Sequence, residues 1–291
     1  MAGPIDLAGK VAVVTGVADD VGFGWHIAKA LQAGGADVYL LSHPRVVSIV
    51  ERFLTRDKSA EERKLPFGAG EFKPKALIGC DVACDTAADI SDAQREEKGY
   101  DKGDVSIEGA FAKVKELTPH VDIVIHCVAF SPEIAKTLPE VSRKAYLTAQ
   151  SISAYSLTAM ARAARPLMKG RNGSVVGLSY MASERAVPFY GGGMSSAKAS
   201  LESDARMLAW FLGEDGTRVN IISAGPYASR AAKSIGDIGQ MIDSTAQRSP
   251  LRRPIDAEDV GNAVLFLCSD LAKNITGTTM YVDAGFHAMG A

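Results

Sequence analysis

The sequence Lys10-Val-Ala-Val-Val-Thr-Gly16 runs directly into Val17-Ala-Asp-Asp-Val-Gly22-Phe-Gly24. An apolar run of strand length therefore ends in a glycine-containing turn, and a helix-like stretch follows at residues 25–33. Glycine permits positive φ and a close approach of the backbone to a phosphate, and a helix N-terminus stabilises phosphate charge. The glycine spacing is not the G-x-G-x-x-G of the common dinucleotide fingerprint, so these glycines alone also fit a turn without a ligand.

Six further short apolar runs follow, and several are rich in Val and Ile without polar alternation, as in strands covered on both faces. They are Val38–Leu41, Ala76–Cys80, Val121–His126, Ser174–Leu178, Val219–Ile222 and Met280–Val282. Amphipathic stretches lie between them at residues 146–168, 197–212 and 257–269, the last with Asp256 as its predicted N-cap. This alternation predicts an α/β fold: a single doubly wound, Rossmann-type domain over residues 1–291, with a seven-stranded, mainly parallel sheet flanked by helices.

Residues 51–105 interrupt the alternation of strands and helices. They carry charged clusters such as Arg56-Asp57-Lys58 and Glu96-Glu97-Lys98, and only the strand at 76–80 is clear among them. Too few apolar residues are present for a second domain. We therefore predict two long surface excursions, one on each side of that strand and partly mobile.

The composition of the 291 residues excludes several classes of function. The formal net charge is −2 with both signs interspersed, so no basic surface for nucleic acid or an anionic membrane is expected. No apolar run approaches the ~20 residues that a membrane span requires, and residues 1–10 lack the apolar core of a signal peptide. The irregular spacing of the four cysteines predicts neither a disulfide framework nor a metal site. We expect a soluble protein with reduced thiols.

The end of the second strand in a dinucleotide-binding sheet normally discriminates NAD from NADP. An acidic residue there binds the ribose 2′-hydroxyl, whereas an arginine accepts a 2′-phosphate. This chain has Ser42-His43-Pro44-Arg45 at that point, without an acid. Arg45 therefore leaves NADP open as a cofactor beside NAD.

The most informative stretch for chemistry is Leu178-Ser-Tyr180-Met-Ala-Ser-Glu-Arg-Ala-Val-Pro-Phe-Tyr190-Gly-Gly-Gly-Met194-Ser-Ser-Ala-Lys198. It begins where a strand ends, which is where ligands bind in open α/β sheets. Pro188 and three consecutive glycines keep residues 188–193 out of a regular helix. A helix is expected to begin near Met194 and to carry Lys198 in its second turn.

Most short-chain dehydrogenases place Tyr and Lys one helical turn apart, but here Met194 stands four residues before Lys198. The pattern Tyr180-x9-Tyr190-x7-Lys198 instead resembles the enoyl-[acyl-carrier-protein] reductases of the short-chain dehydrogenase/reductase superfamily, in the branch of plants, apicomplexan parasites and some bacteria. The resemblance extends through nearly the whole chain. Its motifs are Gly16-Val-Ala, Cys80-Asp-Val, Ser142-Arg-Lys-Ala-Tyr146, Gly191-Gly-Gly-Met-Ser-Ser-Ala-Lys-Ala-Ser-Leu-Glu-Ser-Asp204, Asn220-Ile-Ile-Ser-Ala-Gly-Pro226, Ser229-Arg-Ala-Ala-Lys-Ser-Ile-Gly236 and Tyr281-Val-Asp-Ala-Gly285.

The resemblance implies an NADH-dependent enzyme that reduces trans-2-enoyl-[acyl-carrier-protein] thioesters in type II fatty-acid biosynthesis, with acyl carrier protein as the partner that presents the substrate. Hydride addition at the β-carbon moves negative charge onto the thioester oxygen, and one hydrogen-bond donor there is typically worth ~3–4 kcal/mol. The resemblance makes Tyr190 that donor and Lys198 the residue that holds the nicotinamide ribose. Tyr180 would line the substrate pocket and assist catalysis.

Binding positions follow from the same resemblance. Those expected to bind the cofactor are Gly16, Val17, Ala18, Gly22, Phe23, His43, Asp81, Val82, Cys127, Val128, Ala129, Lys198, Ala224, Gly225, Pro226, Tyr227 (through its backbone only) and Ser229. Those expected to form the substrate pocket are Phe130, Tyr180, Tyr190 and Met194. Residues 228–249 would form a loop and helix that close over the substrate. Inhibition by triclosan-like diphenyl ethers, a homotetramer, and a location in a plastid stroma or a bacterial cytoplasm are implied likewise.

Other interpretations of the chain stay open at this point. A ketoacyl or other carbonyl reductase on the same scaffold is disfavoured, because Met194 occupies the position where that chemistry needs Tyr. A nucleotide-sensing scaffold without turnover is disfavoured by the presence of Tyr180, Tyr190 and Lys198. Single residues also have plainer explanations: Tyr180 as a strand-end aromatic, Lys198 as a surface lysine, Cys127 as a small buried side chain and His43 as a solvated loop residue.

Overall fold

The computed structural model describes residues 5–230 and 238–290. Its centre is one seven-stranded sheet with the order β3-β2-β1-β4-β5-β6-β7, in which every neighbouring pair is parallel. The strands are β1 (Val11–Thr15), β2 (Asp37–Ser42), β3 (Ala76–Gly79), β4 (Ile123–His126), β5 (Ser174–Ser179), β6 (Arg218–Ala224) and β7 (Thr279–Val282). All seven apolar runs form the strands predicted for them, and the Rossmann-type α/β fold is confirmed.

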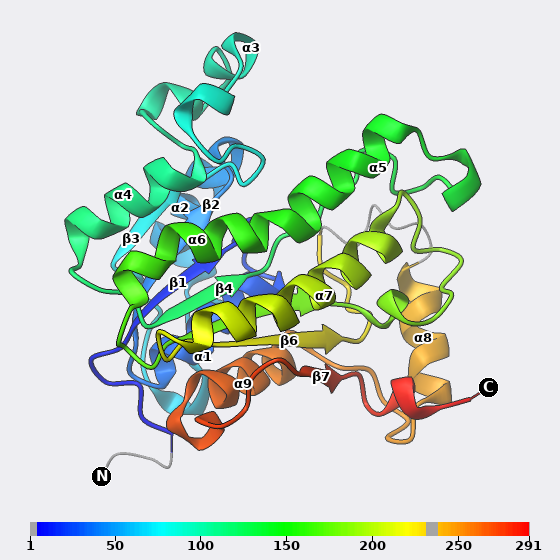
Figure 1. The fold of residues 1–291 in the computed structure, drawn as a ribbon. Coiled ribbons are helices and arrows are strands. Elements are labelled where there is room, and N and C mark those ends of the chain that lie inside the picture. The colour runs from blue at the N-terminus through cyan, green and yellow to red at the C-terminus, as the bar shows by residue number, and fades with distance from the viewer. Residues whose placement is uncertain (1–4, 231–237, 291) are drawn as a thin grey trace.

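Helices cover both faces of the sheet (Figure 1). One face carries α1 (Phe23–Ala33), α2 (Val47–Thr55) and α9 (Ala257–Cys268), and the other carries α4 (Ile107–Leu117), α6 (Ser156–Met168) and α7 (Met194–Gly213). The remaining helices are α3 (Asp92–Arg95), α5 (Arg143–Gln150) and α8 (Ile238–Arg248). The helix expected at 146–168 begins at Arg143 and contains a π-helical turn at Ser151–Tyr155 between α5 and α6. Asp256 caps α9 as predicted.

The strand order reverses beside β1, and this reversal positions the site. The chain runs outward from β1 to β2 and β3, and then returns to place β4 on the opposite side of β1. Thr15 at the end of β1 donates a hydrogen bond from Oγ1 to the Ile125 carbonyl of β4 at 2.8 Å. The chain leaves β1 and β4 toward opposite ends of the sheet, and ligands bind in such sheets at the carboxyl ends of the strands beside this reversal.

The first surface excursion is largely exposed, but it also contributes a side chain to the core. The helix α2 extends to Thr55, and the Phe72 side chain is 1% exposed. The Phe72 ring packs edge-on against Trp25 of α1 with 5.0 Å between ring centroids, and the Trp25 indole N–H donates to the Glu62 carbonyl at 3.0 Å. The burial of Phe72 was not predicted, because a single aromatic residue among charged neighbours gives no periodic signal.

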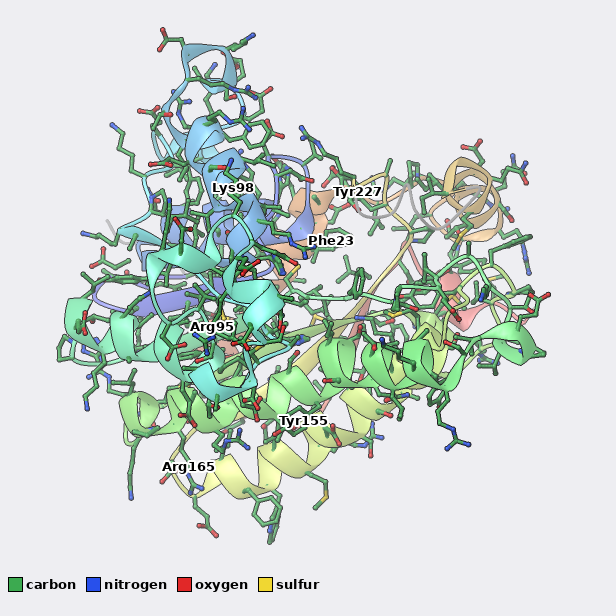
Figure 2. The ribbon with its side chains drawn as sticks, turned by 90° about the horizontal axis from the view of Figure 1, so that it is seen from above. Phe23, Arg95, Lys98, Tyr155, Arg165 and Tyr227 are labelled. Atoms are coloured by element: carbon green, nitrogen blue, oxygen red, sulfur yellow. The ribbon has the colours of Figure 1, made fainter. Side chains whose placement is uncertain are left out.

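The second excursion follows β3 and contains α3 and a small apolar cluster of its own: Cys84, Ile90, Tyr100 and Val105. In Figure 1 it rises above the sheet near β3, and Figure 2 shows Arg95 and Lys98 on it. This cluster is separate from the two main apolar clusters that cover the faces of the sheet.

Replacing Phe72 with alanine is expected to lower the free energy of unfolding by about 3–5 kcal/mol, because a fully buried ring leaves a cavity against Trp25. Phe67→Ala is the matched control, since the Phe67 side chain is 72% exposed in the same excursion. That control should change stability by only about 0.5 kcal/mol. Urea unfolding of both variants checks the prediction, and equal losses would contradict the burial of Phe72.

Within the described ranges, no helix combines the length and apolar character that crossing a bilayer requires. Those ranges also contain no group of three or more His, Cys, Asp or Glu side chains arranged to hold a metal ion.

Candidate active site

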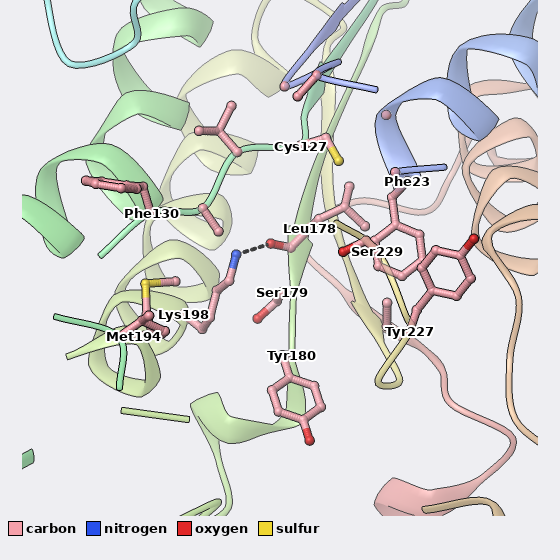
Figure 3. A pocket seen from close by; sticks show the side chains of 18 of the residues that line it. Phe23, Cys127, Phe130, Leu178, Ser179, Tyr180, Met194, Lys198, Tyr227 and Ser229 are labelled. Atoms are coloured by element: carbon pink, nitrogen blue, oxygen red, sulfur yellow. Dashed lines mark hydrogen bonds between the residues drawn. The ribbon is translucent and has the colours of Figure 1, made fainter. Parts of the chain in front are cut away.

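A cavity of about 880 Å³ opens at the carboxyl ends of the central strands (Figure 3). The segments that follow β1, β4, β5 and β6 all contribute to its wall, together with the first turns of α7 and α8. Its volume lies within the range of about 300–1,000 Å³ typical of cofactor and small-molecule sites. The crevice predicted from the strand order is therefore present.

Most of the residues expected to bind ligand line this one cavity. They are Gly16, Val17, Ala18, Gly22, Phe23, His43, Cys127, Val128, Ala129, Phe130, Tyr180, Tyr190, Met194, Lys198, Ala224, Gly225, Pro226, Tyr227 and Ser229. Residues that were not named as binding positions also line it, among them Ser131, Ile134 and Ser179. Ser131 and Ile134 come from the loop after β4, and Ser179 is the last residue of β5.

The turn after β1 brings the N-terminus of α1 to the cavity wall. Asp19 Oδ1 accepts hydrogen bonds from the N–H groups of Val21 and Gly22 at 3.0 and 2.8 Å, and Gly22 is the N-cap of α1. Gly16 has φ +76°, and a Cβ on it would overlap the Cys127 carbonyl of the neighbouring β4 loop. The backbones of the two loops therefore approach closely at Gly16. The first residues of α1 border the cavity beside this contact, where a helix N-terminus favours an anion.

We expect Gly16→Ala to destabilise the fold more than Gly9→Ala does. Both glycines have φ near +75°, but a Cβ on Gly9 would meet no described atom within 4 Å beyond its chain neighbours, whereas a Cβ on Gly16 would meet the Cys127 carbonyl. The shared positive φ should cost each variant about 1 kcal/mol, and the overlap at Gly16 about 1–3 kcal/mol more. Urea unfolding of the two variants tests this prediction. Similar losses in the free energy of unfolding would contradict the close contact between Gly16 and the Cys127 carbonyl.

The ring of Tyr227 also forms part of the wall, although only its backbone was expected to do so. It packs against Phe23 with 5.1 Å between ring centroids, and Figure 3 shows the two rings together. Arg230 follows in the same loop and pairs with Asp20 at 3.0 Å, across to the turn after β1. An aromatic contact and an ion pair therefore hold the loop after β6 against the turn after β1.

Tyr180 and Tyr190 meet at one side of the cavity. Their ring centroids are 5.0 Å apart at an interplanar angle of 66°. Burial raises the pKa of Tyr180 to about 12 and raises that of Tyr190 as well. Both phenols therefore keep their protons at neutral pH and can act as hydrogen-bond donors.

Lys198 lies inside the cavity wall and not on the surface, with 4% of its area exposed. The helix α7 begins at Met194, as predicted, so Lys198 stands in its second turn. Its Nζ donates to the Leu178 carbonyl at 2.7 Å, which is the bond drawn in Figure 3. Burial lowers the pKa of Lys198 from 10.5 to about 8, while Cys127 and Glu202 oppose the shift.

This lowered pKa predicts a pH-dependent stability. Between pH 8 and 10.5 the unfolded chain binds more protons at Lys198 than the native chain does. The free energy of unfolding should therefore rise with pH in that window, relative to the Lys198→Met variant, by on the order of 3 kcal/mol. Denaturant unfolding of the protein and the variant at several pH values checks this; parallel pH profiles would contradict a lowered pKa.

A buried carboxylate behind Lys198 was not anticipated from the sequence. Glu202 lies one helical turn after Lys198, is 5% exposed, and accepts a hydrogen bond from the Ser179 hydroxyl, which itself borders the cavity. The spacing of Lys198 and Glu202 at i and i+4 was the available signal, because such residues share one face of a helix.

Asp81 and Val82 do not line the cavity, in contrast to the expectation for them. The Asp81 carboxylate accepts a hydrogen bond from the Tyr100 hydroxyl at 2.5 Å, and Tyr100 Oη lies 3.4 Å from His43 Nε2. Asp81 is therefore directed into the second excursion, and its Oδ2 lies 3.9 Å from Nε2 of His43 in the cavity wall. Tyr100 could not be foreseen because it is distant in sequence and surrounded by charged residues.

The loop and helix expected to close over substrate, residues 228–249, are placed only in part. Ser229, Ile238 and Met241 border the cavity. Residues 231–237 lie outside the described part of the chain.

Comparison with known proteins gives concordant matches. The family model described as Enoyl-(Acyl carrier protein) reductase matches residues 101–287. The chloroplastic NADH enoyl-[acyl-carrier-protein] reductase of Arabidopsis thaliana is 44% identical over 289 residues, which are 99% of this chain and 74% of that protein.

Two solved structures are similar along their full length. The enoyl-acyl-carrier-protein reductase of Plasmodium berghei, crystallised with triclosan, has a TM-score of 0.92 at 35% identity, covering 97% of this chain and 99% of the other. The Anaplasma phagocytophilum reductase in complex with NAD has a TM-score of 0.79 at 36% identity, covering 98% and 96%. A Rossmann-type fold, a cavity that contains Tyr180, Tyr190 and Lys198, and these full-length matches lead to one conclusion: the chain belongs to the enoyl-[acyl-carrier-protein] reductase family.

Proposed function

We propose that this protein reduces trans-2-enoyl-[acyl-carrier-protein] thioesters with NADH in type II fatty-acid biosynthesis. The observation that carries the proposal is the convergence of Tyr190, Lys198 and the glycine turn after β1 on one cavity. A phenol, an ammonium group and a phosphate-binding turn are the groups that hydride transfer to an enoyl thioester requires.

The cavity fits a dinucleotide. The N-terminus of α1 and the close approach at Gly16 leave room for a pyrophosphate against backbone N–H groups, and Lys198 can donate to ribose hydroxyls further along. When bound, NADH supplies the hydride that reduces the β-carbon. His43 and Val46 would border the adenosine end, and residues 224–227 the nicotinamide end.

The protein stabilises the charge that develops on the substrate. Tyr190 keeps its proton because burial raises its pKa, so it donates a hydrogen bond to the thioester oxygen as that oxygen becomes negative. Lys198 adds a positive charge to the same cavity, which favours the enolate. Tyr180 packs edge-on against Tyr190 and restricts the orientation of its ring.

Apolar side chains in the cavity wall would hold the acyl chain. Phe130, Ile134, Met194 and Met241 line the cavity, and none of them carries a charge. We expect α8 and the segment before it to close over the acyl chain and to exclude water. The same apolar wall beside two tyrosines would accept triclosan-like diphenyl ethers.

We also propose that acyl carrier protein presents the substrate and that the chain assembles as a homotetramer. The helix α7 exposes Met207, Trp210 and Phe211 at 56%, 75% and 54%, an apolar face suited to a second copy. Sedimentation velocity tests the assembly. A plastid stroma or a bacterial cytoplasm is the compartment in which such a pathway would place the protein.

A comparison of two thioesters tests the proposed reaction. NADH oxidation is followed with crotonyl thioester and, separately, with acetoacetyl thioester. We expect turnover with the enoyl substrate and little with the ketone. Turnover with the ketone alone would instead identify a carbonyl reductase, and binding of NADH without any turnover would identify a nucleotide-sensing scaffold.

A further inference from the structure

The turn after β2 carries a cation beside the cavity. His43 and Val46 both border the cavity, and Arg45 lies between them in the same turn, with its N–H directed to His43 Nδ1 at 3.3 Å. In dinucleotide-binding sheets this turn meets the adenosine ribose, and an arginine there accepts the 2′-phosphate of NADP. Arg45 by itself would therefore favour NADPH, in opposition to the proposed use of NADH.

Glu97 pairs with this arginine. The Arg45 Nε donates to Glu97 Oε2 at 2.5 Å, and Arg45 Nη2 pairs with the same oxygen. Glu97 belongs to the second excursion and lies 52 positions away in the sequence. The two side chains are 60% and 34% exposed, and an ion pair this exposed contributes little to stability. The main consequence of the pair is therefore electrostatic: Glu97 offsets the positive charge of Arg45 in the turn after β2.

Backbone and side-chain contacts of the second excursion place Glu97 beside the turn after β2. Gly99 has φ +94°, and a Cβ on it would overlap the Pro44 carbonyl, so the backbone of the excursion touches the turn after β2. The next residue, Tyr100, is anchored by its hydroxyl to Asp81 at 2.5 Å, and its N–H donates to the Glu97 carbonyl at 3.1 Å. Two independent contacts therefore fix the backbone at Glu97.

We propose that Glu97 is a specificity-determining residue, which selects NADH over NADPH by holding Arg45 and by adding a negative charge to the turn that meets the ribose. The inference rests on the proposed function as a nicotinamide-dependent reductase. A 2′-phosphate would have to displace Glu97 from Arg45 and would then be repelled by the released carboxylate. A 2′-hydroxyl carries no charge and meets neither obstacle.

The test is a fluorescence titration of NADH and NADPH with the full chain and four proteins compared: the unmodified protein, Glu97→Gln, Glu96→Gln, and the double variant Glu97→Gln/Arg45→Gln. Glu96→Gln is the matched control, because it makes the same charge change one residue away and forms no ion pair among the described residues. The quantity compared is the ratio of the dissociation constant of NADPH to that of NADH, measured at low and at raised salt.

We expect Glu97→Gln to lower this ratio roughly tenfold at low salt, as expected for a new hydrogen-bonded ion pair with a phosphate, and less at raised salt. Glu96→Gln should leave the ratio unchanged, and the double variant should lose the gain. An unchanged ratio in Glu97→Gln, an equal fall in Glu96→Gln, or a gain that persists in the double variant would each overturn the inference while leaving the reductase intact. Failure of the unmodified protein to bind either nucleotide would overturn the proposed function as well.

Discussion

Tyr190→Phe is expected to lower kcat with an enoyl thioester by about 10²–10³-fold, while the dissociation constant of NADH stays within about twofold. The phenol hydroxyl is the donor to the oxygen that becomes negative, so its loss affects the transition state far more than ground-state binding. The aromatic ring remains in place, and its edge-on contact with Tyr180 is preserved. Steady-state kinetics and a fluorescence titration of NADH measure the two quantities.

Tyr180→Phe is the matched control, because it removes the same atom from the neighbouring ring. We expect it to reduce kcat by less than Tyr190→Phe does, since Tyr180 orients the other phenol without contacting the reacting oxygen. If the two variants were equally impaired, the two tyrosines would act as a unit. An unchanged rate in Tyr190→Phe would remove that residue from the chemistry.

Lys198→Met is expected to weaken NADH binding by about 10–100-fold and to lower kcat/KM by more. A hydrogen bond from a charged donor is worth about 1.5–3 kcal/mol, and the buried ammonium is well placed to donate to the ribose hydroxyls. Methionine keeps most of the side-chain volume, so the wall around Leu178 should not collapse. The additional loss in kcat/KM reflects the positive charge that no longer favours the enolate. Calorimetric titration and steady-state kinetics check both effects.

Lys29→Met is a suitable control for that variant. Lys29 is also a buried lysine, 6% exposed on α1, but it does not border the cavity. The Lys29→Met variant should bind NADH with the same dissociation constant as the unmodified protein. An NADH titration of Lys198→Met that matched the control would contradict the role assigned to Lys198.

The two expected results have a common structural basis. Tyr190 lies in the irregular segment before α7, held by a hydrogen bond from its N–H to the Val187 carbonyl and by one from the Ser195 hydroxyl to its own carbonyl. Lys198 lies inside α7 itself. Because the helix begins at Met194, the phenol and the ammonium reach the same cavity from different elements.

The sequence by itself determined the seven strands and the helices α1, α6, α7 and α9, and its resemblance to a known family named most of the cavity wall. Uninterrupted Val- and Ile-rich runs indicate strands buried on both faces, and the residues directly after such strands must meet at one edge of a parallel sheet. The spacing of Tyr180, Tyr190 and Lys198 carried the family resemblance that named them as catalytic candidates, and the glycines before Met194 predicted where the helix begins. These features are local in sequence, and local patterns report them.

Only the tertiary structure decided what the long excursions do. The burial of Phe72 against Trp25, the anchoring of Asp81 by Tyr100, and the pairing of Arg45 with Glu97 each join residues from separate segments. No periodicity records such contacts, since each depends on one side chain meeting a distant one after the sheet has formed. Long-range pairs of this kind are fixed by packing and charge in three dimensions, and a linear pattern does not contain them.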